Sequence, residues 1–333
     1  MPRQPGLRGD GNVSVMSLAL VSLTPAQSVG IPVALIGSVF LAVGAELQQH
    51  GVTKVGNATT TTKRSGLGWE QVMALARRPS WLTGTLLLGL AIVFQLFSLY
   101  LAPLTVVQPL GAIALVITAL ITARVTKTRL TAPSIRAILY CVGGVGLFVA
   151  VAALTTTTVP ITDTQLLIVV IILGVVLLLF GLGFLLFRER FTRMFYVVGA
   201  GVLFGFVATL AKVLITRIQT IIHGGFHLSP ADWLTILCLL GLAAAGILGS
   251  YFVQTAYSSG SPELVVAGLT VIDPLVGVSI GIIVLGEAAT APLWAGTVFI
   301  LAGAIAIYGV IQLSRHQPRL ASPADRAHPT GST

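Results

Sequence analysis

The sequence predicts an all-α, polytopic membrane protein with about nine transmembrane helices, arranged as two inverted repeats around a linking helix. Three observations lead to this prediction: recurrent apolar runs, a repeat inside the chain, and an uneven distribution of basic residues. Of the 333 residues, 55% are hydrophobic and only 9% are charged, whereas soluble domains carry about 25% charged residues. Apolar runs of about 20 residues, enough for a helix to cross a bilayer core, recur along the whole chain. They lack the alternating polar residues of a membrane β-barrel.

Short polar joints, most of which carry proline or glycine, divide the apolar sequence into nine predicted spans. In chain order the spans are residues 28–48, 81–101, 105–124, 133–153, 164–187, 194–217, 233–256, 262–285 and 291–313. The first four form the predicted first repeat, 28–153, and the last four form the second repeat, 194–313. The fifth span lies in a linking segment, 154–193.

The remaining segments are predicted to lie outside the bilayer core. We expect residues 1–27 and 314–333 to be mobile tails, because the apolar stretch within the first is short and ends at Pro25. The longest joint, about 50–80, holds a Thr-rich stretch at Asn57–Lys63. The segment Trp69–Arg78 follows it and is amphipathic enough to lie at the membrane interface.

The second to fourth spans and the seventh to ninth spans contain an internal repeat. Residues 95–151 align with residues 254–310 at a constant offset of 159, and 13 of the 57 aligned pairs are identical. Composition alone should give roughly a tenth in a chain this rich in Leu, Ala, Val and Gly. The identical pairs include Gln95/Gln254 and Pro103/Pro262. A duplication of about half a membrane domain therefore explains the pattern better than a solenoid, whose repeat unit is far shorter.

The Lys and Arg residues of the joints predict the orientation, because basic residues are enriched on the cytoplasmic side. If the N-terminus is outside, 15 of the 19 basic residues lie inside, leaving Arg3, Arg8 and Arg217 outside and Lys212 within a span. The inner basic residues are Lys54, Lys63, Arg64, Arg77, Arg78, Arg124, Lys127, Arg129, Arg136, Arg188, Arg190, Arg193, Arg315, Arg319 and Arg326. The chain is thus predicted to have its N-terminus outside and its C-terminus in the cytoplasm. Equivalent spans of the two halves then run in opposite directions, which is the architecture of many secondary transporters.

Composition and motifs exclude several classes of function. The net charge of +9 resides mainly in joints and tails and forms no basic helix face, so no nucleic-acid partner is predicted. Cys141 and Cys238 fall inside spans and suggest neither a disulfide framework nor a metal cluster. The chain contains no P-loop and no supported catalytic constellation, so we expect neither an enzyme nor a bound cofactor.

Asp273 is the leading candidate for a functional residue, because it lies near the middle of its span. A carboxylate there costs at least about 2.5–3.5 kcal/mol on insertion scales, so it should face a cavity or a partner. Pro274 follows it and leaves the Thr270 carbonyl without its usual helical donor. An acid beside a freed carbonyl suits a metal cation or a proton. The alternative is a structural Asp satisfied by hydroxyl groups or by Lys212, with Pro274 as a packing kink.

Glu46 and Lys212 are further candidates for binding a substrate or ion. Glu46 lies near the inner end of the first span, where it could be a gate, a second ligand, or a side chain that reaches interfacial water. Lys212 could pair with an acid, attract an anionic substrate, or reach water at the outer side. Glu287 ends its span at the outer face, where we expect it to be exposed.

Two repeat-related amides and two prolines complete the candidate site. Gln95 and Gln254 can bind a substrate or join helices by hydrogen bonds, and their duplication favours a position lining a shared cavity. Pro109 and Pro274 predict helix breaks in the third and eighth spans.

The run Ala102-Pro103-Leu104-Thr105-Val106-Val107-Gln108-Pro109-Leu110-Gly111-Ala112, with Gly143-Gly144, resembles the drug/metabolite transporter superfamily. It is most similar to the NIPA-type magnesium transporter branch, although Thr128-Arg129-Leu130 lacks the acid of that branch's Glu-Lys-Leu element. Asp273-Pro274 and Leu285-Gly286-Glu287 resemble EamA-type permeases. The resemblance implies a multi-pass carrier of Mg²⁺ or another cation in the plasma membrane.

Two other functions remain open at this point. One is proton-coupled export or import of a small organic metabolite or drug. The other is a non-transporting membrane scaffold or lipid-handling partner, which would not need a midplane acid. The expected partners are the lipid bilayer and a small ion or metabolite, and a homo-oligomer stays an open alternative.

The orientation can be tested by cysteine labelling. A cysteine at residue 60, in the longest joint, should react only with reagents that reach the cytoplasmic side, because this joint carries five of the inner basic residues. Labelling of residue 60 from outside would reverse the predicted topology.

Overall fold

The computed structural model describes residues 23–56, 79–125, 127, 130–187, 193–223, 232–259 and 262–315. The Thr-rich stretch and the segment Trp69–Arg78 lie outside these ranges, as do residues 1–22 and 316–333 of the predicted tails. The last residues of the predicted N-terminal tail are instead helical, because α2 begins at Pro25.

The described residues are helical throughout their apolar segments. The helices are α2 (Pro25–Gly56), α4 (Pro79–Leu101), α5 (Leu104–Leu110), α6 (Ala112–Val125), α7 (Ala132–Thr155), α8 (Asp163–Phe187), α9 (Arg193–His223), α10 (Asp232–Ser259), α11 (Pro262–Ile283) and α12 (Leu293–Arg315). Together α5 and α6 form one span, so the described part of the chain contains nine helical segments long and apolar enough to cross a membrane. The predicted all-α, multi-span fold is confirmed.

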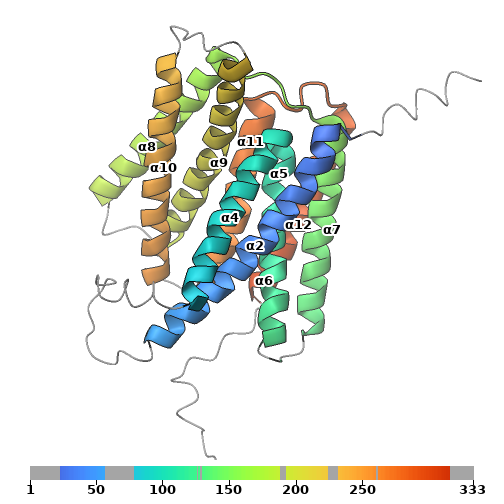
Figure 1. Cartoon of the computed structure of the whole chain (residues 1–333), viewed down its shortest axis with the longest axis vertical. Coiled ribbons are helices and arrows are strands. Elements are labelled where there is room, and N and C mark those ends of the chain that lie inside the picture. The colour runs from blue at the N-terminus through green and yellow to red at the C-terminus, as the bar shows by residue number, and fades with distance from the viewer. Residues whose placement is uncertain are drawn as a thin grey trace, which may run out of the picture.

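The packing of the helices repeats between the two halves of the chain (Figure 1). In the first half, α2 packs along α4 and also contacts α5 and α6. In the second half, α9 packs along α10 and also contacts α11. The equivalent helices α2 and α9 are the first and sixth spans, so they run in opposite directions. The two halves thus share a packing arrangement, and α8 lies beside α10 at the edge of the bundle.

Contacts between the halves are made mainly at two places. The helices α7 and α12 pack along each other, and α11 lies against α5. Glycine allows the first contact to be close: a Cβ atom on Gly144 would lie 2.5 Å from the Ala306 backbone nitrogen. The backbone of α12 thus occupies the space that a side chain at Gly144 would need, as is common between membrane helices.

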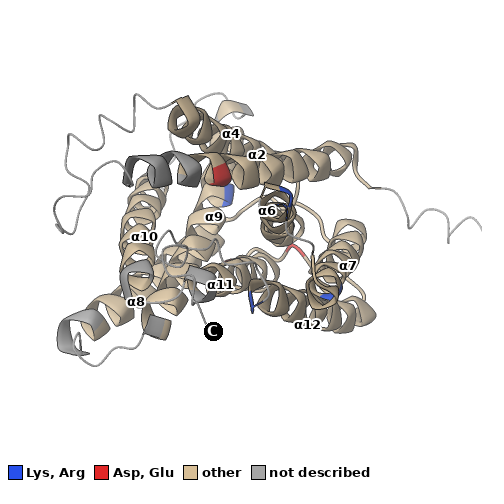
Figure 2. Ribbon diagram, turned by 90° about the horizontal axis from the view of Figure 1, so that it is seen from below, with Lys and Arg blue, Asp and Glu red and all other residues tan. Residues whose placement is uncertain are grey.

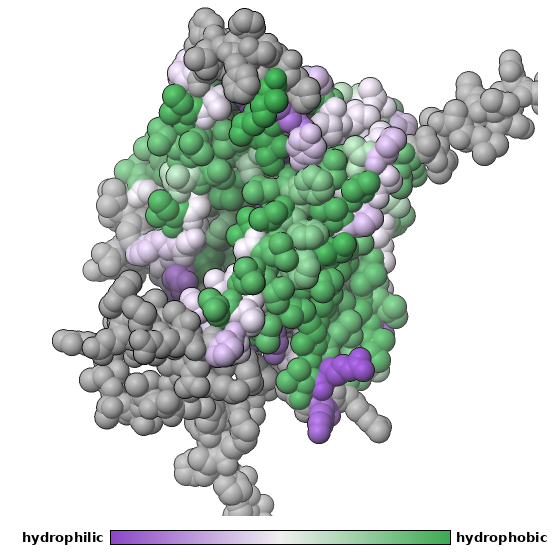
Figure 3. Space-filling view, viewed as in Figure 1, coloured by the Kyte–Doolittle hydropathy of each residue, from purple (hydrophilic) through white to green (hydrophobic). Residues whose placement is uncertain are grey.

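The surface of the bundle is that of a membrane protein. Large apolar side chains are exposed around it, including Leu86, Ile247 and Ile300. Figure 3 shows apolar residues over most of the described surface on one face. Charged residues are sparse among the described helices when seen from below (Figure 2). An apolar exterior of this kind is stable only in contact with lipid.

The contact between α7 and α12 makes a stability prediction. Gly144→Ala should lower the stability by about 1–3 kcal/mol, because the added methyl group meets the backbone of α12. Thermal unfolding in detergent should show a lower midpoint. Gly143→Ala and Gly146→Ala are matched controls, because a Cβ atom there meets no atom within 4 Å. They should be neutral or stabilising by helix propensity, and equal behaviour of all three variants would contradict the packing argument.

Candidate functional site

The third span is interrupted between α5 and α6. Pro109 lacks a backbone N–H, and Gly111 stands between the two helices. The hydroxyl group of Ser38 on α2 donates to the carbonyl oxygen of Leu110, at 3.1 Å. All seven residues of α5 are buried. The break predicted at Pro109 is therefore present, and one of its carbonyl groups is satisfied by a different helix.

The turn from α4 to α5 is bound by Glu287, which follows α11. The carboxylate accepts hydrogen bonds from the backbone N–H groups of Leu104 and Thr105, at 2.7 and 2.8 Å, and from the Thr105 hydroxyl group, at 2.6 Å. It thus caps the N-terminus of α5, where an anion is favoured. Gly286 has a φ of 71° and so permits the turn that places Glu287 there.

Glu287 is 2% exposed, so the expectation that it lies exposed at the interface was wrong. That expectation followed from its position at the end of a span. The backbone N–H groups at the start of α5 have no acceptor within the helix. Because they are buried they need one, and the Glu287 carboxylate supplies it inside the bundle.

Lys212 of α9 binds the other side of the same turn. Its ammonium group donates to the carbonyl oxygens of Leu99 and Ala102, at 2.6 and 2.9 Å, at the C-terminus of α4. Cations are favoured there, and the carboxylate of Glu287 attracts it as well. Lys212 is 2% exposed. Lys212 therefore does not reach outer water, and its hydrogen bonds go to the turn rather than to Asp273. We call the five hydrogen bonds of Lys212 and Glu287 to this turn the turn clamp.

A cavity of about 560 Å³ lies between the two halves of the bundle. Residues of α2, α4, α5, α6, α9 and α11 line it, together with Gly111. Most of the lining is apolar. Its polar side chains are Ser38, Gln95, Gln108, Thr270 and Asp273.

Asp273 is the one acidic side chain that lines this cavity, and its Oδ1 atom is buried without a hydrogen-bond partner among the residues that the structure describes. The helix α9 approaches closely here, because a Cβ atom on Gly205 would lie 3.0 Å from the Asp273 carbonyl oxygen. Pro274 lies within α11, which runs without interruption from Pro262 to Ile283, so the predicted helix break is wrong at this proline; the residue also lines the cavity. An acid without a partner, beside a proline and facing a cavity, can accept hydrogen bonds from a ligand or hold a cation.

The two repeat-related amides occupy different environments. Gln95 lines the cavity, whereas Gln254 is exposed on α10 and is not among the lining residues. The expectation that both face a shared cavity is therefore wrong for Gln254. Gln108 of α5 was not among the residues singled out from the sequence, but it is buried and lines the cavity, and its Nε2 atom has no partner among the described residues. Its position directly before Pro109 was the available signal.

Glu46 does not line the cavity. It is half-buried on α2, where its Oε2 atom is 3.5 Å from the Thr122 hydroxyl group of α6. Asp273 and Glu46 therefore do not form one compact site. Groups of three or more His, Cys, Asp or Glu side chains are absent from the described helices and joints, so a preformed metal cluster is not found there.

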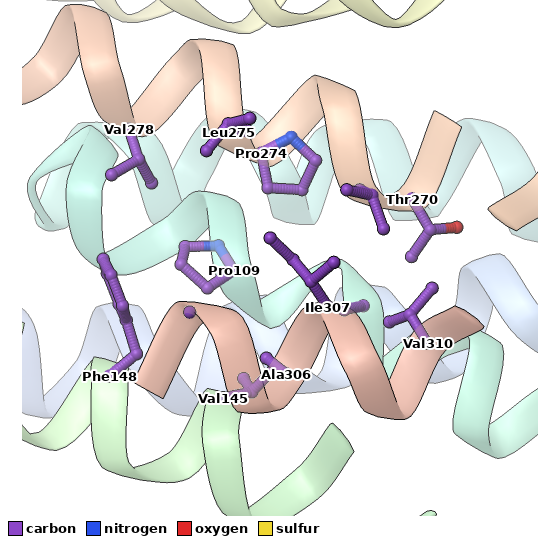
Figure 4. Close-up of a pocket in the computed structure, with 13 residues that line it drawn as sticks. Pro109, Val145, Phe148, Thr270, Pro274, Leu275, Val278, Ala306, Ile307 and Val310 are labelled. Atoms are coloured by element: carbon purple, nitrogen blue, oxygen red, sulfur yellow. The ribbon is translucent and has the colours of Figure 1, made fainter. Parts of the chain in front are cut away.

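A second, apolar pocket of about 90 Å³ lies on another side of α11, between α11, α12, α7 and the α5–α6 break. Figure 4 shows Pro109 and Pro274 facing it from their two helices, with Phe148 and Ile307 among its walls. Thr270 and Pro274 line both this pocket and the larger cavity. The middle of α11 is therefore loosely packed on two sides.

Comparison with known proteins gives a family and one relative. The model of the family described as magnesium transporter NIPA matches residues 26–257. An uncharacterized protein of Corynebacterium glutamicum is 26% identical over 262 residues, which cover 78% of this chain and 87% of that protein. No solved structure matches.

The turn clamp can be tested by removing its charges one at a time. Lys212→Met and Glu287→Gln should each lower the stability by about 3–5 kcal/mol, because each leaves one buried charge without its counterpart. The double variant should lose less than the sum of the two losses, measured as thermal midpoints in detergent.

The ion pair of Arg217 and Asp163 provides the control. It joins the two side chains at 3.1 Å, but Asp163 is 52% exposed. Asp163→Asn should therefore cost at most about 1 kcal/mol. Additive losses at Lys212 and Glu287, no larger than that of the control, would show that the clamp contributes little.

Proposed function

This chain belongs to the NIPA magnesium transporter family, and from that premise we propose that it carries Mg²⁺ by alternating access through the cavity beside Asp273. The chain is a multi-pass membrane transporter. What the proposal adds is the ion, the site and the mode of movement. The single observation that carries it is Asp273, the acidic residue that lines the cavity between the halves and whose buried Oδ1 atom has no partner among the described residues.

The chemistry of Mg²⁺ suits a site with one acid. The ion keeps several of its waters and is commonly bound through only one or two carboxylates. Asp273 supplies one negative charge at mid-span, where an ionisable residue needs a functional reason. The buried cation of α9, Lys212, binds the turn between α4 and α5, and its hydrogen bonds do not go to Asp273.

Alternating access is supported by the way that the halves meet. The cavity lies between elements of both, and the equivalent helices α2 and α9 run in opposite directions. Inverted repeats of this kind can open a central site to either side of the membrane by rocking one half against the other. Glu46, in the first half, would then hold the ion after Asp273 along the path rather than together with it.

A second candidate function is the proton-coupled movement of a small organic molecule. The largely apolar wall of the cavity favours it, because ligand pockets for organic molecules are mostly apolar with a few polar groups. Asp273 would then take up and release the proton, while Gln95 and Gln108 would contact the molecule. In this case purified protein should release protons when a metabolite is added and should not move Mg²⁺.

Mg²⁺ flux in proteoliposomes tests the proposal. Asp273→Asn should reduce the flux roughly tenfold or more, because it replaces a charge-assisted contact worth about 1.5–3 kcal/mol with a neutral one. Asp163→Asn is the matched control, since it makes the same chemical change at an exposed site away from the cavity, and its flux should equal that of the parent protein. A flux that survives Asp273→Asn unchanged would remove Asp273 from the transport path.

A further inference from the structure

We propose that the cavity binds a divalent cation with its water shell intact, holding the waters rather than the metal. This inference rests on the proposed transport function and concerns the form in which the ion is recognised. A hydrated cation presents hydrogen-bond donors on every side. A site for it should therefore offer acceptors from several directions, one net negative charge, and enough room for the shell.

The hydroxyl groups of the cavity offer acceptors. The Ser38 proton is directed to the carbonyl oxygens of Ala34 and Leu110, at 3.0 and 3.1 Å. The Thr270 hydroxyl group donates to the carbonyl oxygen of Val266, at 2.8 Å. Because each proton is engaged by the backbone, only the oxygen lone pairs remain for a ligand.

The middle of α11 adds two more acceptors. The Asp273 side chain lines the cavity, and its buried Oδ1 atom is not engaged by any of the described residues. The Thr270 carbonyl faces Pro274 one turn later, which has no N–H group to donate. The helix α11 thus carries three acceptors: the Asp273 carboxylate, the Thr270 hydroxyl group and the Thr270 carbonyl group.

Two amides complete the lining from the first half. Gln95 and Gln108 line the cavity from α4 and α5, and a Gln side chain can turn its oxygen toward a donor. Gln108 is held against α11, because a Cβ atom on Gly277 would lie 2.9 Å from its Cγ atom. The polar groups therefore come from four helices, α2, α4, α5 and α11, which surround one space.

The size of the cavity favours the hydrated ion over the bare ion. Six waters in an octahedral shell occupy roughly 180 Å³ at about 30 Å³ each, which a cavity of about 560 Å³ can accommodate. A bare Mg²⁺ needs ligands converging to about 2.0–2.1 Å in near-ideal geometry. The described residues do not gather such a set of acidic or imidazole ligands.

Cobalt(III) hexaammine tests this inference, because its six ammonia ligands do not exchange and its N–H groups point outward as the O–H groups of a hydrated cation do. It should bind the purified transporter in calorimetry and compete with Mg²⁺ in proteoliposome flux. Spermidine, which is also a trication but has no octahedral shell, is the control for charge alone. Equal binding of both compounds would contradict recognition of a shell.

Two threonine variants localise the binding. Thr270→Val removes a hydroxyl acceptor from the cavity at nearly constant shape and should weaken hexaammine binding roughly threefold or more. Thr118→Val is matched to it, since the Thr118 hydroxyl group also donates to a carbonyl oxygen one turn back, that of Ala114, but does not line the cavity. It should leave binding unchanged. Equal effects of the two variants would place the hexaammine outside the cavity.

The outcomes separate this inference from the proposed function. If the protein moves Mg²⁺ but hexaammine neither binds it nor inhibits the flux, the transported ion is dehydrated. That result would overturn the inference and leave the proposed function intact. Absence of Mg²⁺ flux, with hexaammine binding that is lost in Asp273→Asn, would overturn the function and retain the hydrated-cation site. Hexaammine binding that is unaffected by Asp273→Asn would overturn the inference whatever the flux.

Discussion

The structure depends on how the backbone hydrogen-bonding groups of one buried turn, between α4 and α5, find their partners. Between α4 and α5 the backbone leaves carbonyl groups at the end of one helix and N–H groups at the start of the next, in a turn whose residues Leu99, Ala102 and Leu104 are buried. Lys212 and Glu287 supply a cation to the first and an anion to the second. Both come from the second half of the chain, so the clamp joins the halves and fixes where the buried α5 begins.

The position of α5 determines the cavity. From a fixed start, the short helix carries Gln108 to the cavity and ends at the break beside Gly111, where Ser38 binds the Leu110 carbonyl. The clamp also engages the buried charges of Lys212 and Glu287 at this turn. Asp273 is left without a hydrogen-bond partner for its Oδ1 atom among the described residues, and this difference between Asp273 and the two engaged charges is the physical basis of the proposed cation site.

The spans could be predicted because a helix that crosses the lipid needs mostly apolar residues along its whole length. The mean hydropathy of a window of that length detects such a run. The repeat at offset 159 pairs α4 with α10, which pack along α2 and α9 respectively, and it pairs the third span with α11. It failed for Gln254, because sequence symmetry does not specify which face of α10 meets α9. It also gave no warning of Glu287, whose burial depends on open N–H groups about 180 residues earlier in the chain. Hydrogen bonds between segments far apart in the sequence depend on the fold, so local sequence patterns do not predict them.

The central claim is that the cavity beside Asp273 is the cation site. Mn²⁺ shares the oxygen-ligand preference of Mg²⁺ and scatters anomalously, so its position can be measured in crystals of the protein. The account predicts an anomalous peak inside the cavity, farther from the Asp273 carboxylate than the roughly 2.1 Å of direct coordination, and no such peak in Asp273→Asn. A peak at Glu46 alone, or a peak in the cavity that persists in Asp273→Asn, would contradict it.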